Sequence, residues 1–400
     1  MWGAHGMEIY RDAADLIRLN RPEQPVLAFR PHAAERAARW FLQNFPGTCL
    51  YAVKANDAPH MLAVLHGAGI RDFDVASLRE IEQLSPLSDI RAHLMHPIKS
   101  RDMIRRAYFD YGVRSFALDC EAELDKILCE TGNARDLTLM VRMACPNSYS
   151  QIPLDDKFGI SWLEAADLLR KTRQAAERLG LTFHVGSQAM APEAFGHALR
   201  SVSQHIVHAG VVADIIDVGG GFPSVYPGLE PPELSTYTDE IGEVFEQIPV
   251  GMHCELWAEP GRALVAEAES VIVRVDGRRG DTLYINDGSF GVLYDAAHLD
   301  FVFPARRIEA AGAAPAPGLK PFALYGPTCD DVDHMKGPFY LPANMAEGDY
   351  IEIGNIGAYG RVMATLFNGF GDYQEAILED EPMLTAYGAA EALAGRIAKA

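Results

Sequence analysis

A lysine inside an apolar run is the first residue of this chain whose type and setting suggest chemistry. Lys54 lies in the segment YAVKAN, which spans residues 51–56. Burial disfavours an ammonium ion, and a neutral amine forms a Schiff base with an aldehyde. Alternatively, Lys54 extends from the end of a strand into solvent and keeps its charge. The segment alone leaves both interpretations open.

Three consecutive glycines suggest an anion site. Gly219, Gly220 and Gly221 follow the predicted strand Asp214–Val218. Glycines leave backbone N–H groups unshielded and permit positive φ, so such a run can surround an oxyanion. The alternative is a plain flexible turn. The position of the run, after the seventh of the strands described below, favours a phosphate site.

A carboxylate follows the next apolar run, at Glu259 in the motif EPGR. Beside a pyridine nitrogen, a carboxylate keeps that nitrogen protonated, and a protonated ring accepts electrons during decarboxylation. The alternative for Glu259 is an ion pair with Arg262 at the end of the strand.

Other polar residues can serve either a site or the core. His184 can stack on an aromatic cofactor and Ser187 can hydrogen-bond a phosphate, although a lone strand histidine is often a core residue. Tyr359 can donate its hydroxyl to a phosphate or simply pack. In the segment GPTCDDVD, residues 326–333, Cys329 and Asp330 form either a solvated acidic turn or a thiol and an acid that face a cationic substrate.

Eight short apolar or β-branched runs, which alternate with helical segments, must position these groups. The alternation predicts parallel β–α–β units, and eight of them predict a closed (β/α)8 barrel of the TIM type, with reactive groups at the carboxyl ends of the strands. One helix is expected to begin at a capping box, Ser161 to Glu164, and to bury a stripe that includes Trp162 until Gly180 ends it. The predicted strands are Cys49–Ala55, Phe73–Ala76, His93–His96, Ser115–Leu118, Leu137–Met143, Leu181–Val185, Asp214–Val218 and His253–Trp257.

The pattern changes after residue 267 and predicts a second, mostly antiparallel β domain. The expected strands are Ser270–Asp276, Asp281–Asp287, Phe322–Tyr325 and Tyr350–Ile353, with a turn at 277–280 between the first two. A small-residue loop at 310–318 and a short helix at 389–400 are also expected. We therefore expect an N-terminal segment, 1–30, that contributes to the β domain, a barrel over 31–267 and the β domain over 268–400.

Composition limits the classes of protein that the chain can represent. Its 400 residues are 48% hydrophobic and 22% charged, which is typical of soluble globular proteins. The net charge of −20 disfavours nucleic acid as a partner and weakly favours a cationic substrate. The sequence shows neither a membrane-spanning run nor the pattern of a signal peptide. Six scattered cysteines without a C-x-x-C pair predict reduced thiols in the cytoplasm and no metal site.

In this order and at these strand ends, the motifs resemble those of the alanine-racemase-like amino-acid decarboxylases (fold type III), most closely the ornithine decarboxylases. The resemblance covers roughly residues 25–375. It implies a pyridoxal 5′-phosphate enzyme of polyamine biosynthesis that decarboxylates L-ornithine to putrescine. Decarboxylation of L-lysine to cadaverine is a second reaction that the resemblance allows.

The resemblance also implies a role for each matching residue. Lys54 matches the lysine that holds the cofactor as a Schiff base, and Cys329 matches a catalytic cysteine. Asp330 matches the acid that receives the distal ammonium of the substrate. In that family Cys329 and Asp330 reach into the barrel of the partner, so each site needs a homodimer. The other matches are Asp74 near the lysine, Arg142 in the cofactor's hydrogen-bond network, His184 on the pyridine face, Glu259 at the ring nitrogen, and Ser187, Gly219, Gly220, Gly221, Arg262 and Tyr359 around the phosphate.

Two departures concern the substrate. In the family segment NDG-x-Y-G, this chain has Phe290 in place of the tyrosine. The LYD at residues 293–295 lies closer to this segment than in the family, so Asp295 is expected as a second substrate acid only on a shifted alignment. Ornithine and lysine differ by one methylene, worth about 1–3 kcal/mol of discrimination, so the choice between them stays open.

Two other functions remain as alternatives. A diaminopimelate decarboxylase must bind a second amino-acid end and should offer a cation and a Cys-Glu-Ser type motif, whereas Asp330 and Asp331 suit a bare ammonium. A non-catalytic regulatory relative should have lost the lysine, the cysteine or the glycine run, and all three are present.

Overall fold

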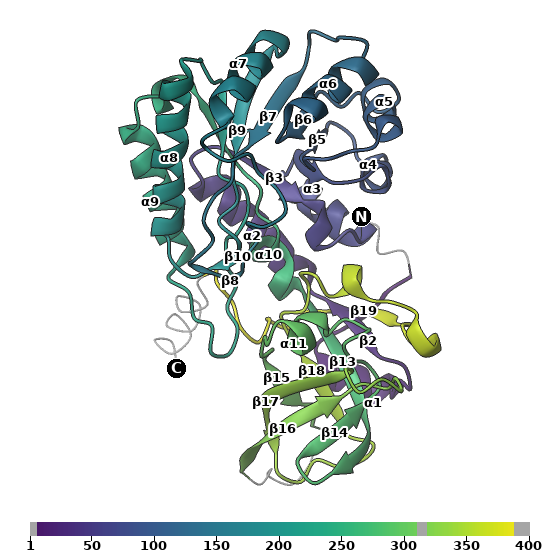
Figure 1. The fold of residues 1–400 in the computed structure, drawn as a ribbon. Helices are drawn as coiled ribbons and strands as arrows, with labels where there is room; N and C mark the ends of the chain where they lie inside the picture. Colours follow the sequence, from purple (N-terminus) through teal and green to yellow (C-terminus); the bar gives the residue numbers. More distant parts are fainter. Residues whose placement is uncertain (1–5, 310–317, 388–400) are drawn as a thin grey trace. The chain divides into compact units, whose positions relative to one another are not determined.

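The computed structural model describes residues 6–309 and 318–387. The chain forms two compact units (Figure 1): a barrel unit of residues 38–223 and 231–261, and a β unit of residues 1–37, 224–230 and 262–400. The segment 224–230 therefore groups with the β unit, although it lies within the range expected for the barrel. The expected helix at 389–400 and almost all of the expected loop at 310–318 lie outside the described residues.

The barrel unit contains a closed ring of parallel strands, as the sequence predicts. Each strand pairs in parallel with the next, and the last pairs with the first. In order around the ring the strands are β3 (Thr48–Ala52), β4 (Asp72–Val75), β5 (Arg91–Leu94), β6 (Ser115–Leu118), β7 (Thr138–Arg142), β9 (Arg178–Thr182), β11 (Ile215–Asp217) and β12 (Glu255–Ala258). The prediction of a (β/α)8 barrel is confirmed.

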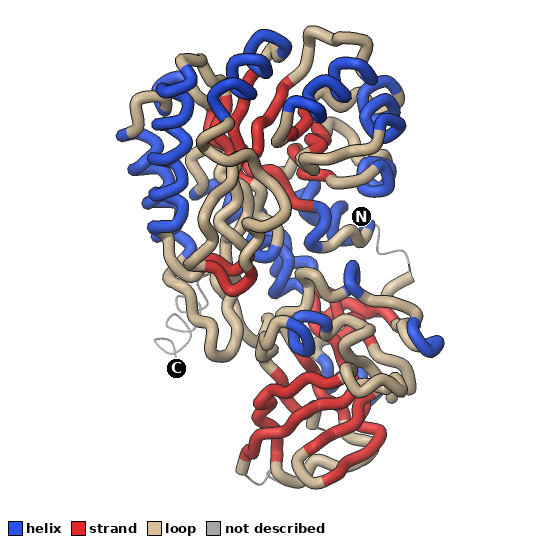
Figure 2. Tube along the Cα trace, in the orientation of Figure 1, coloured by secondary structure: helices blue, strands red, loops and turns tan. Residues whose placement is uncertain are grey.

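Helices follow the strands and lie outside them (Figure 2). Serine side chains begin two of them: Ser77 accepts a hydrogen bond from the Glu80 N–H, and Ser100 accepts one from the Met103 N–H. The helices are α2 (Pro31–Asn44), α3 (Pro59–Ala68), α4 (Leu78–Leu84), α5 (Arg101–Phe109), α6 (Glu121–Glu130), α7 (Ala165–Ala175), α8 (Glu193–Ala209) and α9 (Leu234–Gln247).

The predicted extent of α7 was wrong at both ends. The helix ends at Ala175 and β9 begins at Arg178, so the residues up to Gly180 belong to the barrel and not to the helix. Ser161 does hydrogen-bond Glu164, but the helix begins at Ala165 and Trp162 is 62% exposed. Pairing with β7 and β11 prevails over the local helical spacing of the apolar residues.

Side chains from alternate positions fill the interior of the barrel and make it a packed core. A buried cluster inside it comprises Leu50, Met95, Ala117, Met140, Ile215 and Trp257. Because this core fixes the strands, groups at their carboxyl ends are held in a defined arrangement.

The β unit is a mixed sheet. Strand β13 (Glu269–Arg279) pairs antiparallel with β2, β14 and β18, whereas β19 (Gln374–Leu378) pairs parallel with β1 and β2. The predicted hairpin forms with a shorter turn, because β13 continues through Arg279. The remaining strands are β1 (Glu8–Tyr10), β2 (Val26–Phe29), β14 (Thr282–Ile285), β15 (Ala305–Arg307), β16 (Leu319–Tyr325), β17 (His334–Pro342) and β18 (Tyr350–Ile353).

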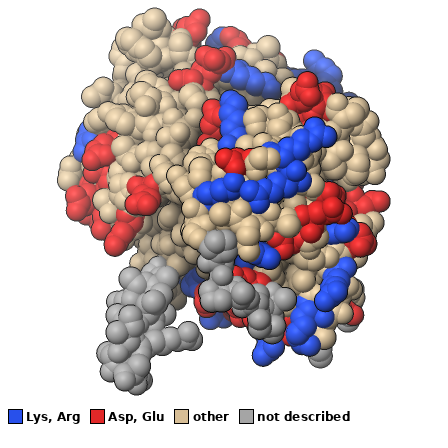
Figure 3. Space-filling model, turned by 90° about the horizontal axis from the view of Figure 1, so that it is seen from below, with Lys and Arg blue, Asp and Glu red and all other residues tan. Residues whose placement is uncertain are grey.

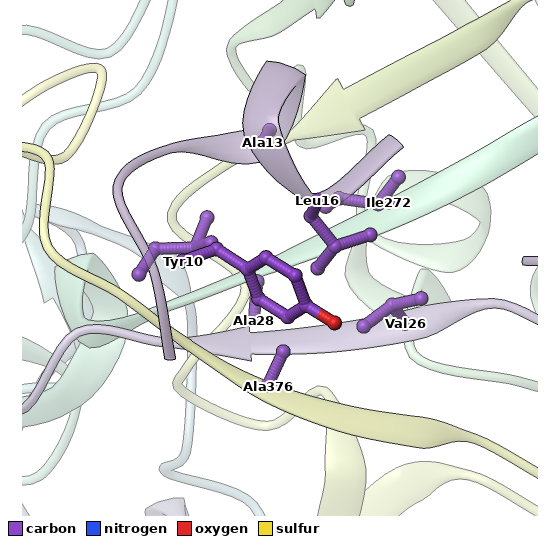
Figure 4. Packing of buried hydrophobic residues seen from close by; sticks show 8 residues of the cluster. Tyr10, Ala13, Leu16, Val26, Ala28, Ile272 and Ala376 are labelled. Atoms are coloured by element: carbon purple, nitrogen blue, oxygen red, sulfur yellow. The ribbon is translucent and has the colours of Figure 1, made fainter. Parts of the chain in front are cut away.

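The N-terminal residues are part of the core of the β unit. Tyr10 and the helix α1 (Ala13–Asn20) pack on Val26 of β2 and Ile272 of β13 (Figure 4). Ala376 of β19 closes the same cluster from the other end of the chain. The contribution of the N-terminal segment to this unit therefore rests on buried apolar surface.

The surface carries charges of both signs. On the face in Figure 3, acidic and basic side chains are interspersed. None of the described helices has the length and apolar character needed to cross a bilayer.

Candidate active site

Lys54 and Asp74 lie at the carboxyl ends of two neighbouring barrel strands. Lys54 is in the short 3-10 helix η1 (Val53–Ala55) after β3, and Asp74 is in β4. The ammonium nitrogen of Lys54 is 2.9 Å from Oδ2 of Asp74. The Lys54 side chain is 44% exposed and that of Asp74 only 4%, so the amine is reachable while its partner is fixed. This geometry fits a lysine that reacts with a carbonyl compound.

Glu259 and Asp217 form a buried pair of carboxyl groups at the ends of β12 and β11. Burial raises the pKa of Asp217, and burial together with the Asp217 charge raises the pKa of Glu259 well above its usual range. Oε1 of Glu259 and Oδ2 of Asp217 have no hydrogen-bond partner among the described residues. Glu259 does not pair with Arg262, the alternative that its sequence motif left open, since Arg262 binds Asp295.

The glycine run is packed so closely that a side chain has no room. A Cβ on Gly220 would lie 2.9 Å from the carbonyl oxygen of Glu259 and 3.1 Å from Nε2 of His184. Gly219 and Gly221 have φ values of +67° and +106°, and a Cβ on Gly221 would lie 2.5 Å from the Gly186 carbonyl oxygen. The backbone is thus free to approach a ligand closely, as a phosphate cradle requires.

His184 lies two residues after the end of the barrel strand β9 and is a neutral imidazole. Its Nδ1 accepts a hydrogen bond of 3.0 Å from the Gly186 N–H, so the ring proton lies on Nε2, the nitrogen nearest to Gly220. Burial, and next the charges of Arg142 and Lys54, lower its pKa well below the usual value. A neutral, fixed imidazole at this position can stack on an aromatic ring.

Arg142 and Ser187 occupy further strand ends of the barrel unit. Arg142 is the last residue of β7, half-buried, and its charge acts on both His184 and Asp217. Ser187 begins the short strand β10 (Ser187–Ala189), which pairs antiparallel with β8 (Ser150–Ile152).

Two residues of this region were not predicted from the sequence. Asp217 is one, and its signal was an acidic residue at the end of an apolar strand. Asn147 is the other: it is buried, and its Nδ2 donates to the carbonyl oxygens of His184 and Cys145 at 3.0 and 2.6 Å. It ties the segment after β7 to the histidine. The motif PNSY that contains it carried no recognisable signal.

Within the β unit, Arg262, Asp295 and Tyr359 form one cluster. The guanidinium of Arg262 is 3.0 Å from Oδ2 of Asp295 and 3.0 Å from the hydroxyl oxygen of Tyr226, and it lies over the Tyr359 ring at 4.9 Å. Its Nε has no partner among the described residues. Asp295, expected as a substrate acid, therefore has its charge compensated by Arg262 and is only 5% exposed.

The segment that carries Cys329 and Asp330 is held in place by hydrogen bonds to the buried side chain of Asp333. The Asp333 carboxylate is 1% exposed and accepts hydrogen bonds from the N–H groups of Ser289 and Thr328. The Cys329 N–H donates to Oδ1 of Asn368 at 3.1 Å. Cys329 and Asp330 themselves are exposed. The thiol and the acid are thus presented outward on a fixed turn of the β unit.

The barrel residues fit pyridoxal phosphate in three respects. Lys54 is an amine for an aldehyde, the glycine run has no side chains to shield its N–H groups from a phosphate, and the buried acid pair matches a basic ring nitrogen. The predicted residues that the structure brings together in this unit are Lys54, Asp74, Arg142, His184, Ser187, Gly219, Gly220, Gly221 and Glu259.

Comparison with known proteins gives consistent results. The family model for the pyridoxal binding domain of pyridoxal-dependent decarboxylases matches residues 32–266. The lysine/ornithine decarboxylase of Selenomonas ruminantium is 30% identical over 346 residues, 84% of this chain and 84% of the relative.

Solved structures show the same similarity. The arginine decarboxylase of Paramecium bursaria Chlorella virus, bound to agmatine, has a TM-score of 0.80 at 26% identity and covers 91% of this chain and 98% of its own. The lysine/ornithine decarboxylase of Vibrio vulnificus, complexed with putrescine, has a TM-score of 0.78 at 28% identity and covers 92% and 99%.

Proposed function

This chain belongs to the pyridoxal-dependent decarboxylases, and from that premise we propose that it converts L-ornithine to putrescine and L-lysine to cadaverine, a step of polyamine formation. The observation that carries the proposal is the convergence of Lys54, the glycine run and the Asp217–Glu259 pair at the carboxyl ends of the strands of one barrel. An amine, an anion site and an acid are the three groups that this cofactor needs. When bound, pyridoxal phosphate accepts the electron pair that CO2 leaves behind.

The barrel residues bind and orient the cofactor. Lys54 attaches it covalently, and Asp74 holds the lysine amine in place through the 2.9 Å contact. Glu259 would keep the ring nitrogen protonated, and neutral His184 would stack on the ring. Arg142 contributes its charge to this network.

The phosphate is held by groups from several segments. Ser187 and the N–H groups of Gly219, Gly220 and Gly221 provide neutral donors. Arg262 follows Glu259 by three residues in the chain and supplies the positive charge, with Tyr359 as a further donor.

The substrate is selected by its distal ammonium. Asp330, exposed on its turn, binds that ammonium, and Cys329 or Lys54 returns a proton to Cα after CO2 has left. Cys329 and Asp330 serve the barrel of a second copy of the chain, so the enzyme is a homodimer with shared sites. Asp295 pairs with Arg262 and therefore does not bind the substrate.

Release of CO2 tests the function. The chain, supplied with pyridoxal phosphate, is incubated with ornithine, lysine, arginine or diaminopimelate, and kcat/KM is measured for each. We expect turnover of ornithine and lysine above the other two. Preference for diaminopimelate would assign the other decarboxylase activity, and a chain that binds the cofactor but turns over none of the four would be a regulatory relative.

Mixing two inactive variants tests the shared sites. Lys54→Ala and Cys329→Ala each remove one half of a site. After random subunit exchange in an equal mixture, half of the dimers are mixed and each has one intact site, so the mixture regains about a quarter of the parent activity. No regain on mixing would place both halves in one chain. We also place the enzyme in the cytoplasm, where its six free thiols remain reduced.

A further inference from the structure

Asp217 has no assigned role, yet it is the most deeply buried acid near the candidate ring-nitrogen site. Its side chain is 0% exposed, and Oδ1 accepts a hydrogen bond of 2.8 Å from the Gly219 N–H. Its other oxygen, Oδ2, is buried and receives no hydrogen bond from the described residues, and the neighbouring carboxyl group with which Asp217 interacts is that of Glu259. The backbone fixes this arrangement, since the Glu259 N–H donates to the Gly219 carbonyl oxygen at 2.8 Å.

Two carboxylates without a donor between them cannot both stay ionised in such a place. Each buried, unpaired charge costs several kcal/mol, and like charges at short range add to that cost. One proton between Asp217 and Glu259 removes the repulsion and satisfies both orphan oxygens at once.

The surrounding charges leave this conclusion unchanged. Asp74 on β4 adds a third negative charge, whereas Lys54 after β3 and Arg142 on β7 supply positive ones. Lys54 is committed to Asp74 at 2.9 Å. His184 is neutral and donates nothing to either acid among the hydrogen bonds of the described residues. The net negative charge of this region therefore resides on Asp217 and Glu259.

We infer that Asp217 and Glu259 hold a single proton between them in the cofactor-free protein, and that this proton passes to the ring nitrogen when pyridoxal phosphate binds. The inference rests on the proposed role of Glu259 at that nitrogen. In the transfer, the O–H bond of the acid pair breaks and an N–H bond forms on the lone pair of the pyridine nitrogen. Both acids are then ionised, with the pyridinium as their counter-ion, and no proton is drawn from solvent.

Asp217 is in this sense a positioning residue that acts through Glu259. It accepts a backbone N–H on one side and fixes the proton of Glu259 on the other. Its negative charge, left behind after the transfer, stabilises the pyridinium against loss of the proton.

Proton counting during cofactor binding tests the inference. Calorimetry of pyridoxal phosphate binding to the cofactor-free chain, in buffers of different ionisation enthalpy at pH 8, gives the number of protons taken up. In Asp217→Asn the like charge is removed and the new amide can donate a hydrogen bond to the Glu259 carboxylate, so Glu259 is ionised before binding and this variant takes up about one proton more than the parent. Asp72→Asn is the control: Asp72 is also a buried barrel acid, but it is paired with Arg91 and His93, and the count stays at the parent value. Equal counts in the parent and in Asp217→Asn would overturn the inference.

Infrared spectroscopy gives an independent readout that needs no variant. The cofactor-free parent at pH 8 shows the carbonyl band of a buried carboxylic acid, and the band disappears when pyridoxal phosphate binds. A band that persists after binding contradicts the transfer, even if Asp217→Asn does not fold. A parent that binds no cofactor, or that binds it and releases no CO2 from any amino acid, contradicts the proposed function instead.

Discussion

The guanidinium of Arg262 and the carboxylate of Asp295 lie 3.0 Å apart, and their side chains are only 3% and 5% exposed. A buried charge that loses its partner costs about 3–5 kcal/mol, far more than a surface ion pair contributes. Asp295 is therefore needed to keep Arg262 in place, whatever ligand the arginine binds.

Asp295→Ala is predicted to lower the free energy of unfolding by about 3 kcal/mol. Asp295→Asn, which retains a hydrogen-bond acceptor, should lose less. Urea denaturation of the cofactor-free chain measures both changes. Asp300→Ala serves as the control, because the Asp300 side chain is 80% exposed and its ion pair with Lys336 is long, at 3.7 Å. A stable Asp295→Ala variant with a raised KM would instead assign Asp295 to the substrate.

Gly220→Ala is predicted to weaken the binding of pyridoxal phosphate about tenfold or more, which corresponds to at least about 1.4 kcal/mol. The new methyl group would press on the Glu259 carbonyl and on the His184 ring, both of which belong to the proposed site. Titration of the cofactor-free chain with pyridoxal phosphate gives the affinity. Gly242→Ala is the matched control in α9, where a Cβ meets only Pro46 at 3.4 Å. Equal affinities in the two variants would remove the glycine run from the cofactor site.

Lys54→Ala is predicted to abolish the visible absorbance of covalently bound cofactor and to reduce CO2 release by several orders of magnitude. Lys171→Ala, on the exposed face of α7 and paired with Glu121, should leave both unchanged. Absorbance spectra of the purified holoenzymes are sufficient. If Lys54→Ala kept the band, another lysine would hold the cofactor.

Asp330→Ala is predicted to lower kcat/KM for ornithine and lysine about 30- to 150-fold, because a charge-assisted contact to the distal ammonium is worth about 2–3 kcal/mol. The visible band of the cofactor should not change. Asp331→Ala offers a neighbouring exposed acid for comparison. Steady-state kinetics on both diamino acids separates the two positions, and an equal effect of the two variants would point to general surface charge.

Burial raises the pKa of Asp287 to about 7, so stability should depend on pH. An unfolded aspartate titrates near 4, so the folded chain holds an extra proton between about pH 4 and 7 and loses stability as the pH rises, by about 1.4 kcal/mol per unit from this group. Asp287→Asn, which can still accept the Tyr373 hydroxyl, should lack that loss. Urea denaturation at pH 5 and pH 8 compares the two chains. Parallel pH dependences would show that Asp287 does not titrate in this range.

The sequence predicted the barrel well because buried parallel strands are short apolar runs that local composition reveals. It failed at the boundary between α7 and β9, where apolar residues at helical spacing continue into the strand and only pairing with β7 and β11 decides the outcome. Local patterns carry no information about that pairing.

The candidate site was predictable where a motif stands at a strand end, as at Lys54 and Gly220. The ion-pair and hydrogen-bond partners of each group could not be predicted. Whether Arg262 pairs with Glu259 or Asp295 depends on how distant segments meet, and the sharing of a proton by Asp217 and Glu259 depends on their burial. Neither property is visible in residue spacing.

The pairing of β19 with β1 and β2 has a consequence for synthesis of the chain. Strands β1 and β2 are synthesised well before their partner β19, because residues 30–373 lie between β2 and β19 in the chain. Until then the edge of β2 and the apolar side of Tyr10 are uncovered on the nascent chain. A barrel that closes on its own strands can form during this interval, whereas the sheet of the β unit is complete only after Leu378 has been synthesised.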